Sequence, residues 1–206
     1  MKNLKALQTE VAKRIKNDPA HDYSHIMRVY KNAQRIAKHE NADLGLVLTA
    51  VLLHDIVHFP KSDKRSKAAS IKSADLAKKI LAKYDYSKKE IRIITDAIRD
   101  HSYSRNKRPK TLEGKILQDA DRLDVLGSIG IARTFSVGGA EGRPMYNELD
   151  PFCQKRRPDD KALTADHFYR KLLVLEKKMN TEFARKEARR RTKILRGFLL
   201  ELKKEI

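Results

Sequence analysis

Apolar residues recur at helical spacing through most of the chain, and two helices are predicted before residue 40. The first covers residues 3–16 and ends at the Asn-Asp-Pro sequence that follows it. The second runs from Asp22, a favourable N-cap residue, to His39. Both have one apolar face, which predicts packing against a common core.

A third predicted helix, LGLVLTAVLLHDIV, is apolar on nearly every side. It begins after Asp43, a second N-cap candidate, and ends before Pro60. Its apolar stretch from Leu44 to Leu53 is much shorter than the roughly 20 residues of a membrane span. We therefore expect this helix at the centre of the protein.

Further helices are expected over about 67–83, from Ser87 to about His101, from Thr111 through the sequence QDADRLDVLG, and over about 164–179 and 181–205. Ser87 and Glu90 have the spacing of a capping box. Gly127 and Gly130 indicate a break or close packing. Residues 102–110 are predicted to form a basic loop, and residues 136–162 a long irregular segment of the kind that often binds ligands.

The pattern contains no alternating strand, repeat or linker. It predicts an all-α protein with residues 1–206 in one domain, a core of about 20–130 and C-terminal helices of about 164–205. The sequence leaves the oligomeric state open.

Charge adds information about partners. The 206 residues include 46 Lys and Arg against 27 Asp and Glu, a formal net charge of +19. Such a field attracts anions, including nucleotides and nucleic acid, although a solvated basic surface is an equally good explanation. Basic residues gather in 61–67, 105–110 and 185–196. The N-terminal residues lack the features of a signal peptide, so we expect a cytoplasmic protein that does not span a membrane.

Candidate metal-binding residues stand out against the apolar pattern. His54 and Asp55 end the most apolar helix, where burial of both is costly without compensation. His25 lies on the preceding helix, and QDADRLD carries Asp119, Asp121 and Asp124. Taken alone, each histidine fits a hydrogen-bonded core residue better, and Asp121 could pair with Arg122 or Arg133.

Together, these imidazoles and carboxylates suit a divalent ion such as Mn, Fe, Mg, Co or Ni. Cys153 is the only cysteine, which excludes both an internal disulfide and a cysteine-based zinc site. His54-Asp-Ile-Val-His58 has the spacing of the zinc-protease H-E-x-x-H, but an aspartate replaces the required glutamate. We reject that interpretation.

Four segments carry a resemblance to a known family: HDYSHIMRVY (21–30), LLHDIVH (52–58), EGKILQDADRLDVLGSIGIARTF (113–135) and HFYRKLLVLEKKMNT (167–181). They resemble the HD superfamily of metal-dependent phosphohydrolases, in particular its small stand-alone bacterial and archaeal members, which include nucleotide pyrophosphohydrolases. The resemblance covers about 20–200. It implies an all-α HD fold in which His25, His54, Asp55 and Asp121 bind one metal.

The expected activity is hydrolysis of a nucleotide phosphoester or phosphoanhydride by a metal-activated water. The candidate catalytic residues are Asp55, Asp121, Asp124, His58 and His101, and the candidate phosphate contacts are Arg28, Lys115, Arg122, Arg133 and Arg143. His58 is expected one helical turn after His54 and could instead interact with the helix dipole, and His101 could bind a second metal.

Two other functions are compatible with the sequence. One is a basic nucleic-acid-binding protein with a structural or degenerate metal site, whose binding would weaken steeply with salt. The other is a signalling hydrolase acting on cyclic nucleotides or guanosine tetraphosphate.

Overall fold

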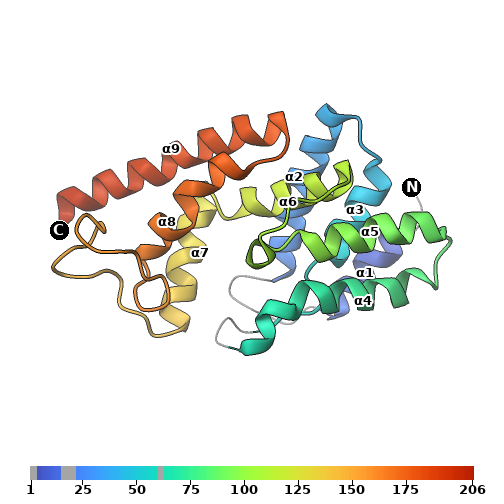
Figure 1. The fold of residues 1–206 in the computed structure, drawn as a ribbon, viewed down its shortest axis with the longest axis horizontal. Helices are drawn as coiled ribbons and strands as arrows, with labels where there is room; N and C mark the ends of the chain where they lie inside the picture. The colour runs from blue at the N-terminus through green and yellow to red at the C-terminus, as the bar shows by residue number, and fades with distance from the viewer. Residues whose placement is uncertain (1–3, 15–21, 60–62) are drawn as a thin grey trace. The chain divides into compact units, whose positions relative to one another are not determined.

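The computed structural model describes residues 4–14, 22–59 and 63–206, and Figure 1 labels their helices. All regular elements in these ranges are helical, which confirms the predicted all-α class. Contacts divide the chain into two compact units, residues 1–121 and 122–206, and each is described here by itself. The prediction of one domain over 1–206 stays a prediction.

The α-helices of the first unit are α1 (Leu4–Arg14), α2 (Tyr23–Glu40), α3 (Leu44–Leu53), α4 (Ala69–Leu81), α5 (Lys88–Asp100) and α6 (Leu112–Asp124), the last of which extends into the second unit. Helix α3 is central because it packs against α1, α2, α4 and α5. Every residue from Leu46 to Leu53 is buried, as expected for a helix that is apolar on all sides.

Helices α4 and α5 form an antiparallel pair (Figure 1). The short 3-10 helix η1 (Lys64–Ala68) leads into α4, and Ser87 begins α5 with the predicted capping box. As a result, the start of α4 and the end of α5 lie at the same end of the pair.

Two predicted helices differ from those observed. The third ends at Leu53 rather than continuing through Val57, because the residues after His54 form a turn. The predicted helix over 164–179 is split at Lys171 into α8 (Asp166–Arg170) and a 3-10 helix, η3 (Leu172–Lys178). Both interruptions leave the apolar pattern intact, so periodicity alone could not locate them. In the described residues, no helix is both long and apolar enough to cross a membrane.

In the second unit, η3 and α7 (Gly127–Ala140) pack against the long helix α9 (Glu182–Glu205). Phe135, Phe168 and Phe198 form a mutual cluster, in which the ring centroid of Phe168 lies 6.1 Å from Phe135 and 5.6 Å from Phe198, and those two rings are 5.8 Å apart. Residues 141–165 form the irregular segment, which is shorter than predicted because α7 extends to Ala140.

The predicted glycine break separates α6 from α7. Gly127 has φ of 70°, a left-handed conformation that favours glycine, and the side chain of Arg191 lies against it. A β-carbon on Gly130 would collide with the carbonyl of Val125. The break therefore requires both glycines.

An ion-pair group on α9 centres on the buried carboxylate of Glu187 and contacts the end of α6 through Arg191. Glu187 accepts hydrogen bonds from Arg190 and Arg191, each at 2.8 Å, and Arg191 also donates to the carbonyl of Leu123 at 2.6 Å. The bonds from Arg190, followed by those from Arg191, outweigh burial and lower the pKa of Glu187 to about 2.

Replacing Glu187 with Gln should lower the free energy of unfolding at pH 7 by about 1–2 kcal/mol, because two guanidinium groups lose their carboxylate partner. Since the pKa of Glu187 is depressed, this contribution is present above pH 4.5 and is lost as the pH falls toward about 2. Urea unfolding at several pH values measures it. Glu182→Gln, which affects the exposed Glu182–Lys186 pair on the same helix, is the control and should change stability by less than about 0.5 kcal/mol. Equal losses in the two variants would contradict this account.

Candidate metal centre

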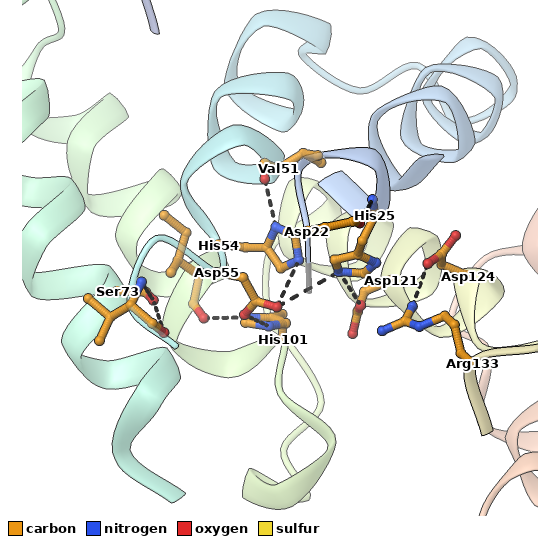
Figure 2. A network of polar contacts seen from close by, with 12 residues as sticks. Asp22, His25, Val51, His54, Asp55, Ser73, His101, Asp121, Asp124 and Arg133 are labelled. Atoms are coloured by element: carbon orange, nitrogen blue, oxygen red, sulfur yellow. Dashed lines mark hydrogen bonds and ion pairs between the residues drawn. The ribbon is translucent and has the colours of Figure 1, made fainter. Parts of the chain in front are cut away.

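Five side chains from four segments of the first unit converge on one point (Figure 2). They are His25 near the start of α2, His54 and Asp55 at the end of α3, His101 at the end of α5, and Asp121 on α6. The four predicted metal-binding residues are thus brought together, and His101 joins them.

The distances between these groups are longer than hydrogen bonds. Asp55 Oδ2 lies 3.8 Å from His25 Nε2 and 3.6 Å from His54 Nε2, and Asp121 Oδ1 lies 3.7 Å from His25 Nε2. Ligands placed about 2.1 Å from a shared ion are about 3–4 Å from one another. The observed spacing therefore fits a set of donors arranged around a cation.

Two of the imidazoles are oriented in the same way. His54 and His101 are the C-cap residues of α3 and α5, and both have φ −67° and ψ −35°. The Nδ1 of each lies 2.6 Å from the carbonyl oxygen three residues earlier, Val51 or Ile98. A carbonyl only accepts, so Nδ1 must carry the proton. In the neutral ring, the lone pair is then on Nε2, which faces the carboxylates.

His54 provides the clearest test of whether a metal ion fits. Its ring is fully buried, and Nε2 has no hydrogen-bond partner among the described residues. An unsatisfied buried nitrogen is costly unless something binds it. Together with Asp55 and Asp121, whose side chains are 19% and 26% exposed, it forms a donor set suited to a divalent ion reached from solvent.

Electrostatic interactions within the cluster shift the pKa values of its members in different directions. Burial lowers the pKa of His54, which favours the neutral ring that binds metals. Burial also opposes protonation of His101, but Asp55 and Asp121 outweigh it and raise the pKa of that ring. Burial would raise the pKa of Asp121, yet the three neighbouring imidazoles outweigh this effect and lower it.

Neighbouring polar groups hold these residues in place. Asp22, the predicted N-cap, accepts the backbone N–H of His25 at 2.8 Å. The buried amide of Asn32 on α2 donates to the carbonyl of Ala120 on α6 at 3.2 Å. In the turn after Asp55, Ser73 of α4 accepts from the backbone N–H of Val57.

Three arginines that were predicted to contact phosphate bind other groups within the second unit. Arg133 forms an ion pair with Asp124, whose side chain is almost fully buried (Figure 2). Arg122 donates to the carbonyl of Lys178, and Arg143 donates to that of Asp160. These interactions give all three arginines structural roles, and the catalytic role of Asp124 stays a prediction.

The remaining candidates lie in the first unit. Arg28 is on α2, one turn after Ser24, to which it donates at 3.3 Å, and Lys115 is on α6. His58 was expected one helical turn after His54, which is wrong, because α3 has already ended. The zinc-protease motif requires both histidines on one face of a helix. His54 and His58 do not meet this requirement.

Sequence reasoning did not identify two buried amides, Asn32 and Gln118. Gln118 Nε2 lies 3.1, 3.3 and 2.9 Å from the carbonyls of Asp100, His101 and Lys107. The available signal was position, since Gln118 precedes Asp121 by one turn in the most specific sequence block.

Both a family model and a relative from Bacillus subtilis match much of this chain. Residues 22–126 match the model of the HD domain. The uncharacterized protein YpgQ of Bacillus subtilis is 36% identical over 187 residues, which cover 90% of this chain and 84% of YpgQ.

Solved structures agree over nearly the whole chain. The structure of YpgQ in complex with ADP has a TM-score of 0.77 at 31% identity and covers 99% of this chain and 95% of that one. An HD-superfamily hydrolase from Bacillus thuringiensis has a TM-score of 0.73 at 33% identity, with 98% and 96% coverage. The chain therefore belongs to the HD-domain superfamily of metal-dependent phosphohydrolases.

Proposed function

We propose that this protein hydrolyses a phosphoester or phosphoanhydride bond of a nucleotide with a divalent ion held by His25, His54, Asp55 and Asp121. The observation that carries the proposal is the buried, partnerless Nε2 of His54 beside two carboxylates. The complex of YpgQ with ADP supports a nucleotide as the substrate class. Mn is the first ion to test, and Fe, Mg, Co and Ni also suit these donors.

A bound divalent ion supplies hydroxide at neutral pH and neutralises charge on the phosphoryl oxygens. The side chains of the chain divide the remaining tasks. Asp55 directs Oδ2 toward His25 and His54, while Oδ1 lies 3.6 Å from His101 Nε2. His101 is thereby close enough to Asp55 for an ion pair, and we assign to it the transfer of a proton to the leaving oxygen, with His58 as the second candidate.

The partly exposed Asp121 carboxylate orients the attacking water. We assign phosphate contact in the first unit to Arg28 and Lys115. Arg28 is suited to bidentate contact with a phosphate, whereas Lys115 provides a point charge. Binding by Arg122, Arg133 or Arg143 would compete with the interactions that these arginines already make.

The metal assignment can be tested by equilibrium titration of EDTA-treated protein with Mn. His54→Gln should raise the dissociation constant for Mn by more than about tenfold, because a direct ligand contributes more than the outer groups around it. His39→Gln, which changes an exposed histidine at the far end of α2, should leave the constant unchanged. Circular dichroism checks that both variants are folded. Wild-type affinity in folded His54→Gln would rule out this ligand set.

The reaction can be tested by chromatographic product analysis of a nucleotide panel. Mn should restore cleavage to metal-stripped wild-type protein, and the products identify the broken bond. Asp121→Ala should reduce turnover by at least about a hundredfold, in line with the loss of one group that stabilises a transition state. Mn-independent cleavage, or full activity in the variant, would refute the proposal.

The nucleic-acid alternative gives a different result in these assays. It predicts tight binding of an oligonucleotide that weakens steeply with salt, without turnover of any nucleotide in the panel.

A further inference from the structure

Residues 102–110, here called the basic loop, connect α5 to α6 and begin immediately after His101 of the metal cluster (Figure 1). The segment was predicted as a loop throughout, but it includes a short 3-10 helix, η2 (Tyr103–Arg105). The loop contains Arg105, Lys107, Arg108 and Lys110 and no acidic residue. Lys107 and Lys110 are exposed. A segment of one charge sign at the edge of the site indicates contact with an anion.

The shape of the basic loop is fixed from inside the protein. The two N–H groups of Gln118 are shared among three carbonyls, two at the end of α5 and one at Lys107 in the loop. Pro109 is buried against Gly114, where any β-carbon would lie 2.8 Å from the proline ring. Asn106 adopts a left-handed turn with φ of 47°. The cations therefore project from a structured loop.

The guanidinium group of Arg105 is incompletely hydrogen-bonded within the described residues. Its side chain is 19% exposed, and Nη2 lies 3.6 Å from Asp100 Oδ1, beyond hydrogen-bond distance. Its Nε is buried and has no hydrogen-bond partner among the described residues. A phosphate oxygen is the kind of acceptor that a guanidinium group binds best.

We propose that the basic loop is a phosphate-binding subsite, in which Arg105, Lys107 and Lys110 bind a phosphate of the substrate other than the one attacked at the metal cluster. The proposal rests on the proposed function, because it takes the metal cluster as the active site. It specifies the substrate as a small molecule with more than one phosphate. Gln118 is a positioning residue for this subsite, because it fixes the loop relative to α5 and α6.

The test is calorimetric titration of metal-free protein with inorganic tripolyphosphate. Wild-type protein should bind it, and both Arg105→Gln and the double variant Lys107→Gln/Lys110→Gln should weaken binding by about tenfold or more, as expected for loss of charge-assisted contacts. Lys78→Gln/Lys79→Gln removes the same charge from exposed positions near the opposite end of α4 and should change affinity by less than about twofold. Equal weakening by the two double variants, or no binding by wild-type protein, would overturn the proposal.

Gln118→Ala separates a shaped subsite from a general positive field. It retains every cation of the loop but removes the three hydrogen bonds, so tripolyphosphate binding should weaken while the melting curve remains cooperative. Unchanged binding in this variant would reject the positioning role of Gln118. A single-stranded oligonucleotide that binds more tightly than tripolyphosphate through the same lysines would overturn the small-molecule assignment.

These outcomes are distinct from those of the hydrolysis assay. If wild-type protein binds tripolyphosphate through the basic loop but cleaves no nucleotide, the subsite stands and the proposed reaction fails. If wild-type protein cleaves nucleotides but the loop variants bind tripolyphosphate with unchanged affinity, the reaction stands and the subsite fails.

Discussion

The arrangement of the cluster depends on hydrogen bonds between two imidazoles and the ends of the helices that carry them. Carbonyls in the last turn of a helix have spare acceptor capacity. Val51 O and Ile98 O accept from His54 and His101, each with 2.6 Å between oxygen and Nδ1. One bond therefore fixes a tautomer and aims Nε2 at the carboxylates. Because both rings are buried, turning either one would leave polar groups unsatisfied.

These bonds also define what could be predicted from sequence. The apolar pattern identified α3 as central, and a buried helix that ends in His-Asp indicated that these side chains needed compensation. The pattern could not show that the helix ends at Leu53 instead of Val57. That end depends on a side chain that bonds to its own helix, whereas periodicity reports only which faces are buried. The predicted position of His58 was wrong for this reason.

The arginines show a second limit of sequence reasoning. Arg122, Arg133 and Arg143 have the chemistry of phosphate ligands, but a guanidinium group binds whichever acceptors the fold places near it. Here these are backbone carbonyls and the buried carboxylate of Asp124. Net charge does not show which cations bind phosphate either, because Lys and Arg outnumber Asp and Glu in both units. The burial and bonding of each cation distinguish structural roles from candidate ligand contacts.

Buried amides help three of the four segments, α2, α5 and α6, to keep a common geometry. Apolar packing is not directional, so helices held by it alone can shift relative to one another at modest cost. Asn32 and Gln118 are almost fully buried, and their hydrogen bonds join α2 to α6 and α5 to α6. A shift along either contact would leave a buried donor without an acceptor, which costs more than the lost apolar contact. Because Gln118 and Asp121 are one turn apart on α6, the same constraint that positions the basic loop also positions a predicted metal ligand.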